Sequence, residues 1–266
     1  MDRYNKSKTL RLKSADATTD IPLINQYAVQ PLSPDDVFCF SVVLCDNEID
    51  RDTERFTPKA LKSLAKMFVG KTGITDHDWR ASKQIARVYA AEVVDTNKTN
   101  SLGEPLVQLE AKAYMLNTEE NKATIEAING GILKEVSVGV AMGACNCSIC
   151  GNPLKMNWCT WTRQCENGHI KGEKYAEGLC VGNLEDPSEA YEFSFVAVPS
   201  QRGAGVTKSA EDVGEAFKVL LEADLAKTAD KALCEKLLQR LKAAMMDHQE
   251  LVERAAILKE NEKFLK

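Results

Sequence analysis

Long apolar runs, histidine and an excess of basic charge are all scarce in this chain of 266 residues. No stretch approaches the ~18 apolar residues of a membrane-spanning helix, so we expect no membrane span. The formal net charge is −5, which gives no overall basic field to favour nucleic acid as the main partner. Residues 1–20 lack the apolar core of a secretory signal. We therefore expect a protein that is made and used in a reducing cytoplasm.

The composition that remains is that of an ordinary folded protein, with 44% hydrophobic and 27% charged residues. Residues 1–35 are polar and contain three prolines, and they predict a loosely ordered lead-in. Residues 209–266 are rich in Ala, Glu, Lys and Leu and contain no proline. Apolar positions there recur in steps of four and three, which predicts a helical tail with a coiled-coil seam. The tail is either a scaffold-like segment or an amphipathic hairpin that covers the preceding domain.

Between these segments, residues 36–206 predict one α+β domain. Apolar and β-branched runs predict strands at residues 37–44, 84–94, 106–116, 133–142 and 191–198. A helix is expected to begin at Pro58 after the N-cap Thr57, and a second at residues 118–129, capped by Thr118.

Cysteine is distributed unevenly, because six of the nine cysteines lie within residues 145–180. In an intracellular chain of this length, clustered cysteines with CxxC spacing favour a metal site over disulfides. A set of buried thiols or a redox CxxC pair is the competing interpretation. Neither accounts for a CxxC that is followed, after a loop of 14 residues, by a CxxxH.

The best tetrahedral set is Cys₃His, made of Cys147, Cys150, Cys165 and His169. Cys145 or Cys159 could replace one of these ligands, and Cys180 is the weakest candidate. Four protein ligands leave no open position, so we expect a structural zinc ion with no catalytic role. Residues 145–180 therefore predict a zinc-ribbon insert, which is too small to fold unaided.

Three polar residues are candidates for nucleophilic catalysis. His77 lies in TDHDW after the first helix, Ser137 in the strand KEVSVGV, and Glu192 at the start of the strand YEFSFVAV. A serine nucleophile needs a base to take its proton and usually a third group that orients the base. A single serine or histidine in such a position is more often an ordinary strand or loop residue. It is the order of the motifs around these residues that makes a catalytic role worth considering.

Four segments carry a family resemblance in their correct order. They are VVLCDNEIDRDTERFTPKAL, GITDHDW with the following IARVYAAEVV, GGILKEVSVGV, and YEFSFVAVPSQRGAGV. Together they resemble the prohead (capsid-maturation) proteases of tailed phages, which are relatives of the herpesvirus assemblins. The resemblance runs from about Phe38 to Val206 and is interrupted by the cysteine-rich insert. One departure is PSQ, where that family commonly has a PAN-like sequence.

The resemblance implies a β-barrel-like protease domain with flanking helices. It also implies that Ser137 is the nucleophile, His77 the base and Glu192 the third member of a triad, with Asp186 and Glu189 as nearby rivals. Assemblins use a second histidine as third member.

In this chain the other two histidines are His169, in the metal cluster, and His248, in the tail. An acidic third member therefore fits better than a histidine.

The implied activity is that of a serine endopeptidase, which cleaves capsid and scaffold proteins, and possibly itself, inside an assembling procapsid in the host cytoplasm. Self-association is expected with it. One alternative is a catalytically inactive, zinc-stabilised scaffold or assembly protein. Another is a zinc-ribbon nucleic-acid-binding module. The insert has few basic residues for that role: Lys155, Arg163, Lys171 and Lys174.

Overall fold

The structure is a computed structural model that describes residues 15–207. The predicted tail at 209–266 and the first fourteen residues of the predicted lead-in lie outside this range. Within residues 15–207, no helix is both long and apolar enough to cross a membrane.

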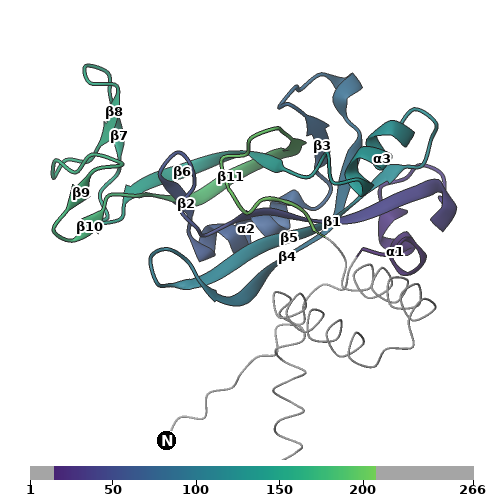
Figure 1. Ribbon diagram of the computed structural model, residues 1–266, viewed down its shortest axis with the longest axis horizontal. Coiled ribbons are helices and arrows are strands. Elements are labelled where there is room, and N and C mark those ends of the chain that lie inside the picture. Colours follow the sequence, from purple (N-terminus) through teal and green to yellow (C-terminus); the bar gives the residue numbers. More distant parts are fainter. Residues whose placement is uncertain (1–14, 208–266) are drawn as a thin grey trace, which may run out of the picture. The chain divides into compact units, whose positions relative to one another are not determined.

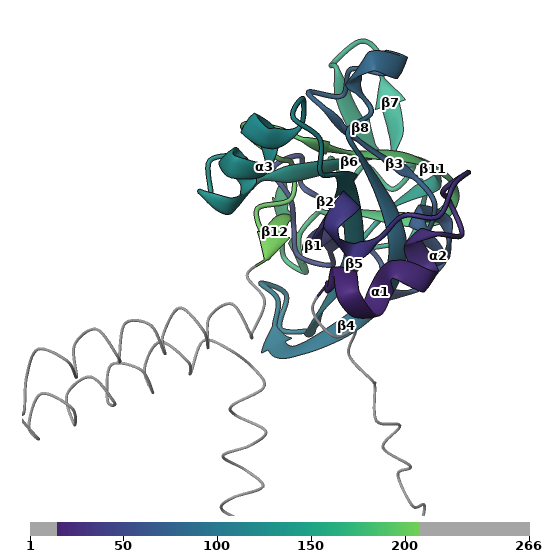
Figure 2. The same ribbon diagram turned by 90° about the vertical axis from the view of Figure 1, so that its right-hand side faces the viewer.

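One large sheet dominates the described residues (Figure 1). Its strand order is β12-β1-β5-β4-β3-β11-β2, and β6 pairs with β11 beside this path. The strands are β1 (Val37–Asp46), β2 (Glu54–Phe56), β3 (Thr72–Thr75), β4 (Ala86–Thr99), β5 (Pro105–Leu116), β6 (Val136–Cys147), β11 (Gly182–Phe195) and β12 (Gly205–Thr207). The helices are α1 (Ala17–Ile24), α2 (Pro58–Phe68) and α3 (Lys122–Asn129), with short 3-10 turns η1 (Pro34–Asp36) and η2 (Ala81–Lys83). In both views, α1 and α3 lie on different sides of β1 (Figures 1 and 2).

The α+β class is confirmed, whereas the predicted barrel is wrong, because the sheet does not close. An isolated bridge between Glu135 and Gly205 connects the start of β6 to β12. Beyond that point β6 runs away from β12, which is only three residues long, and continues toward the insert. A closed barrel would need these two strands to pair along their length.

The predicted helix at Pro58 is confirmed as α2, and it covers the main core. The Thr57 hydroxyl accepts a hydrogen bond from the backbone N–H of Ala60 at 3.2 Å, which caps the first turn. The apolar spacing of α2 turns Leu61, Leu64 and Phe68 inward, and all three are fully buried. Each such side chain contributes about 1.5–3 kcal/mol by leaving water.

Residues 17–24 form α1, where a loosely ordered lead-in was predicted. Asp16 caps this helix, and Pro22 lies inside it. The buried Asp20 carboxylate accepts hydrogen bonds from Lys112 Nζ at 2.8 Å and from Tyr89 Oη at 2.7 Å. These partners lie on β5 and β4, far away in sequence, so a local pattern could not reveal that this segment docks on the sheet.

Two other elements differ from the prediction in their limits. Helix α3 begins after Asn121, because residues 118–121 form a turn closed by the Asn121 N–H to Thr118 C=O bond of 3.1 Å. Strand β11 starts nine residues earlier than predicted and ends at Phe195. Its first half, with Asp186 and Pro187, has the composition of a loop. The proline is tolerated because the pairing of β11 with β6 shifts register between Pro187 and Glu189, at a bulge.

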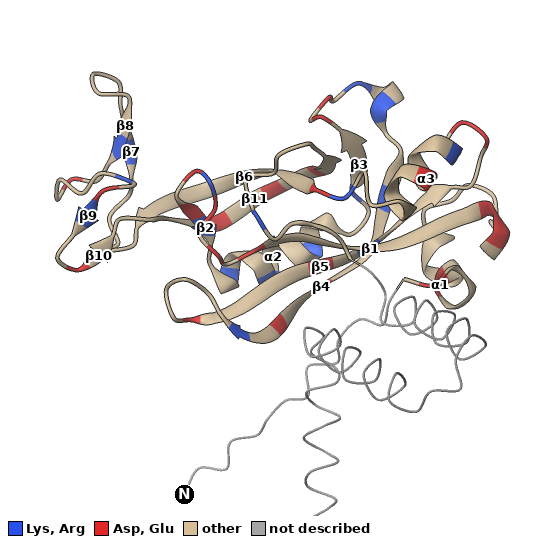
Figure 3. Ribbon diagram, in the orientation of Figure 1, with Lys and Arg blue, Asp and Glu red and all other residues tan. Residues whose placement is uncertain are grey.

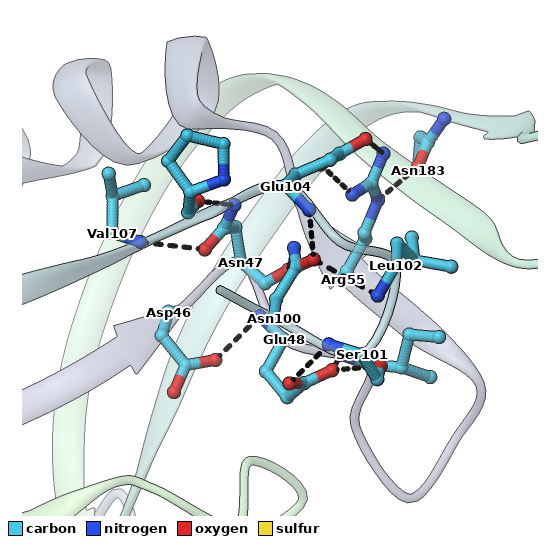
Figure 4. A network of polar contacts seen from close by, with 12 residues as sticks. Asp46, Asn47, Glu48, Arg55, Asn100, Ser101, Leu102, Glu104, Val107 and Asn183 are labelled. Carbon is cyan, nitrogen blue, oxygen red and sulfur yellow. Dashed lines mark hydrogen bonds and ion pairs between the residues drawn. The ribbon is translucent and has the colours of Figure 1, made fainter. Parts of the chain in front are cut away.

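A polar network ties the loop after β1 to the turn between β4 and β5 (Figure 4). The Asn47 side chain donates to the Pro105 carbonyl at 2.9 Å and accepts from the Val107 N–H at 2.8 Å. Arg55 on β2 forms an ion pair with Glu104 in the same turn. These contacts hold the acidic segment at 46–55 against the sheet.

Candidate active site and metal centre

His77 stands in a tight turn that follows β3. Asp76 and His77 both have positive φ angles, of 53° and 52°, which is uncommon for residues other than glycine. Three hydrogen bonds hold this conformation: Asp76 N–H to Phe195 C=O at 3.0 Å, Asp78 N–H to Thr75 C=O at 3.0 Å, and His77 N–H to the Ser194 hydroxyl at 2.8 Å. The fold therefore fixes the backbone of His77 against the end of β11.

The imidazole of His77 contacts Glu192. His77 Nδ1 and Glu192 Oε1 are 2.9 Å apart, and the Glu192 side chain is 3% exposed against 42% for His77. Burial raises the pKa of Glu192, and the hydrogen bond and charge of His77 oppose that rise. The second carboxylate oxygen, Oε2, is buried and has no hydrogen-bond partner within the described residues. With Nδ1 turned to the carboxylate, Nε2 is the ring atom left to act as a base.

Ser137 lies on the same face of the sheet as Glu192. In the antiparallel pair of β6 and β11, Ser137 stands opposite Ser194 and Gly139 opposite Glu192. Phe193 and Phe195 point into the core, so the alternating residues Glu192 and Ser194 face the other way, as do their cross-strand partners. Directly opposed residues have Cβ atoms about 4.5–5.5 Å apart. Ser137 thus neighbours Ser194, which holds the His77 backbone.

Within residues 15–207, no hydrogen bond joins the Ser137 hydroxyl to the His77 ring. Hydrogen bonds between a nucleophile and its base are often loose until a substrate is bound. The structure brings His77 and Glu192 into contact, and it places Ser137 on the neighbouring strand opposite Ser194.

Gly139 makes room for the Glu192 carboxylate. A Cβ atom at this position would stand 2.3 Å from Glu192 Oε1, which is closer than side chains approach one another. The glycine of the VSVGV segment is therefore required by the carboxylate on the neighbouring strand. Neither Gly139 nor Ser194 was predicted from the sequence, although the alternation along each strand puts them on the same face as Ser137 and Glu192.

The two rival acids have other surroundings. Asp186 forms an exposed ion pair with Lys59 at 3.2 Å. Glu189 is exposed on β11 and pairs in register with Ala141. Of the three acidic residues considered, Glu192 is the one that contacts His77 in the described part of the chain. His248 lies outside the described residues.

The second site is a cluster of thiols and one imidazole in the insert. The ligand atoms of the four predicted residues all lie within 4.8 Å of one another: Cys147, Cys150, Cys165 and His169. His169 Nδ1 is 3.4 Å from Cys150 Sγ and 3.6 Å from the sulfurs of Cys147 and Cys165. The sulfurs of Cys150 and Cys165 are 3.5 Å apart. Tetrahedral zinc with the usual bond lengths requires N–S edges of about 3.6 Å and S–S edges of about 3.8 Å. These residues can therefore hold a metal ion of that size.

The remaining cysteines rank differently from the prediction. Cys180, the weakest candidate by sequence, is buried, with its sulfur 3.6 Å from that of Cys147. Cys159 is exposed, and Cys145 lies 4.0 Å from a carboxylate oxygen of Glu54. Cys180 follows Cys147 by 33 residues, so their contact cannot be predicted from local spacing. The chain at 174–179 forms a small hairpin that returns Cys180 to Cys147.

Two small hairpins build the insert, which extends from the ends of β6 and β11 (Figure 1). Their strands are β7 (Lys155–Asn157), β8 (Thr162–Gln164), β9 (Lys174–Tyr175) and β10 (Gly178–Leu179). Gly151, with φ of 76°, turns the chain after the CxxC pair. At the base, the Glu54 carboxylate of β2 accepts from Lys171 Nζ at 2.6 Å. The insert is thus fastened to the sheet by an ion pair as well as by the two strands.

Comparison of the chain with family models, with curated proteins and with solved structures gave no match. The resemblance to prohead proteases therefore depends on the ordered motifs alone, and a function must be argued from the two sites.

Proposed function

We propose that the protein is a serine endopeptidase in which Ser137 is the nucleophile, His77 the general base and Glu192 the group that orients the base. The observation that carries this proposal is the 2.9 Å contact between His77 Nδ1 and Glu192 Oε1, on the sheet face that also bears Ser137. A buried carboxylate that binds one imidazole nitrogen and leaves the other available is the arrangement a serine nucleophile needs.

In the reaction, the Ser137 hydroxyl attacks the carbonyl carbon of a peptide bond. His77 Nε2 takes the hydroxyl proton and then gives it to the departing amine, which leaves an acyl ester on Ser137. A water molecule, deprotonated by the same nitrogen, hydrolyses the ester and restores the serine. Glu192 keeps the proton of the neutral ring on Nδ1 and stabilises the imidazolium that forms, because its charge is buried beside the ring.

The substrate class follows from the motif resemblance. We propose capsid and scaffold proteins, and the chain itself, as substrates during procapsid maturation in the host cytoplasm. Confinement with many copies of these proteins would supply a high substrate concentration, and self-association of the protease fits such an assembly.

For the cysteine cluster we propose zinc held by Cys147, Cys150, Cys165 and His169. When bound, the ion would supply four strong bonds to a segment with too small an apolar core to fold alone. All four ligands are protein side chains, so the role is structural. Two observations support zinc: the distances between these donor atoms are close to those around a tetrahedral zinc ion, and thiolates and imidazole are ligands that zinc prefers.

Cleavage of the cognate capsid protein tests the proposed activity. We expect the wild-type chain to shorten that protein, and itself, in intact-mass spectra, and we expect Ser137→Ala to leave both at full length. Ser63→Ala is a matched control, because Ser63 is half-buried, as Ser137 is, and lies on helix α2 outside the proposed site. If wild type and Ser137→Ala give identical full-length masses, the enzyme proposal fails and the assembly-protein alternative takes its place.

The nucleic-acid alternative finds less support in the insert. Basic and acidic residues alternate there (Figure 3), and Lys171 and Arg163 both face the Glu54 carboxylate, at 2.6 and 4.0 Å. Salt-dependent DNA binding by the intact chain would restore this alternative.

A further inference from the structure

Two exposed aromatic rings flank the proposed catalytic residues. Trp79 follows His77 by two residues, and Tyr191 immediately precedes Glu192. Their ring centroids are 5.3 Å apart with an interplanar angle of 39°. Trp79 is 68% exposed and Tyr191 36%. Water thus reaches a large part of an aromatic pair that stands beside a buried catalytic carboxylate.

The backbone of each ring explains its position. Strand β11 shifts register against β6 between Ala190 and Glu192, so Tyr191 is the extra residue of a bulge. Ala190 consequently faces the core and Glu192 the opposite side, while the Tyr191 ring is turned outward. Trp79 belongs to the turn after β3, where the Asp78 carboxylate accepts from Arg80 and stabilises the loop.

The distance from the nucleophile is set by the strand pairing. The register partners on either side of Tyr191 are Gly139 and Val140, which lie two and three residues beyond Ser137 on β6. Strands rise about 3.3 Å per residue, so the pair lies roughly 7–10 Å from Ser137 along the sheet. An extended peptide covers that distance in two or three residues.

We propose that Trp79 and Tyr191 form a specificity subsite that binds a large apolar side chain of the peptide substrate, two or three residues from the scissile bond. This inference rests on the proposed endopeptidase function and narrows its substrate class. The occupant is a side chain of the bound peptide, because the pair is continuous with the residues that act on that peptide. Two tilted rings offer an apolar wall at low entropic cost, since each ring has only two rotatable bonds.

The chain provides a matched control in a second exposed aromatic pair. Trp158 and Trp161, on the β7–β8 hairpin of the insert, are 69% and 75% exposed, with ring centroids 5.7 Å apart. A Trp158→Ala substitution removes an indole of similar exposure to that of Trp79, but on the insert and 81 residues away from His77 in sequence.

The experiment uses the full chain and a library of peptides from a denatured bacterial proteome, with cleavage sites identified by mass spectrometry. In wild type and in Trp158→Ala, we expect Phe, Tyr, Trp, Leu and Met to be enriched at one fixed position, two or three residues from the cut. In Trp79→Ala that enrichment should fall by about threefold to tenfold, the size of one aromatic contact. Tyr191→Ala should have the same effect, and Tyr191→Phe, which keeps the ring, should not.

The quantity measured is the fraction of cleaved sites that have a large apolar residue at the fixed position. A change in total activity alone does not alter this fraction. Enrichment that is the same in Trp79→Ala and Tyr191→Ala as in wild type would overturn the subsite while leaving the endopeptidase intact. If cutting does not depend on Ser137, as Ser137→Ala reveals in the same library, the proposed function fails and the subsite is overturned with it.

Discussion

At the scale of single residues, the candidate active site places the buried carboxylate of Glu192 against a glycine, Gly139, on the neighbouring strand. Among residues 15–207, one carboxylate oxygen of Glu192 contacts His77 and the other has no hydrogen-bond partner. Gly139 leaves the space that the carboxylate fills. The order of the motifs pointed to His77 and Glu192, which the structure brings into contact, and to Ser137, which lies on the same sheet face. The sequence could not predict that Ser194 holds the His77 backbone, because that contact spans 117 residues and depends on the register of β11 with β3.

Because the pKa of Glu192 is raised, we expect removal of its charge to increase the stability of the fold and to decrease the activity. The folded-state pKa of Glu192 lies above that of the unfolded chain, so protonated Glu192 favours folding and this contribution is lost as pH rises through the folded pKa. At pH 7 we expect Glu192→Gln to raise the melting temperature by a few degrees, an advantage that disappears at acidic pH, where wild type is protonated as well.

The same substitution should lower kcat/KM by roughly 10²-fold or more, because a neutral amide cannot stabilise the imidazolium. Wild-type activity should also fall as pH drops through the raised pKa of Glu192. Calorimetry and a pH–rate profile measure the two effects. A Glu192→Gln protein that is less stable and fully active would show that the carboxylate serves packing alone.

At the scale of elements, local patterns predicted the elements that bury a regular face and missed those fixed by distant partners. Helix α2 and strands β1, β4 and β5 were expected because capping or alternation is visible in the chain. Helix α1 was not, since Asp20 acquires its partners from β4 and β5. The first half of β11 was missed because its polar residues are held by pairing with β6 on one side and with the short β2 on the other.

The buried ion pair that anchors α1 can be tested against an exposed pair. Burial raises the pKa of Asp20, but hydrogen bonds from Lys112 and Tyr89 outweigh this and hold the pKa below its usual value. Lys112→Met should cost about 3 kcal/mol of unfolding free energy, because it leaves a buried carboxylate with less compensation. Lys59→Ala, which removes the exposed partner of Asp186, should cost less than about 0.5 kcal/mol.

Urea unfolding of the full chain measures both values. The wild-type advantage over Lys112→Met should persist above the unfolded pKa of Asp20 and be lost as pH falls through the lowered folded pKa. Equal losses for the two variants would mean that α1 is not anchored by this pair.

At the scale of the whole molecule, the insert that carries the cysteine and histidine cluster lies between the two strands that carry Ser137 and Glu192. Strands β6 and β11 pair along the sheet face that bears Ser137 and Glu192, and they connect to the hairpins of the insert. The clustering of Cys147, Cys150, Cys165 and His169 could be predicted from spacing alone, because CxxC and CxxxH patterns require no long-range information. The closeness of Cys180 required the fold, as did the failure of the sheet to close into a barrel.

We expect the purified chain to contain about one zinc ion, and Cys147→Ser to lose it. Cys159→Ser is the matched control, because Cys159 is exposed and outside the cluster. Metal analysis and limited proteolysis measure the outcome: cuts should appear within residues 148–179 of Cys147→Ser while the sheet stays protected. Unchanged metal content in Cys147→Ser, or equal loss in Cys159→Ser, would contradict the proposed ligand set.

The most direct test of the central claim is covalent labelling of the nucleophile with a fluorophosphonate, which releases fluoride as the serine oxygen bonds to phosphorus. The account predicts one adduct, on the peptide that contains Ser137, formed at the same rate in wild type and Ser63→Ala. In His77→Ala and Gly139→Ala the rate should fall by roughly 10²-fold or more, since the base or its carboxylate partner is lost or displaced. An unlabelled Ser137, or labelling that is equally fast without His77, would contradict the account.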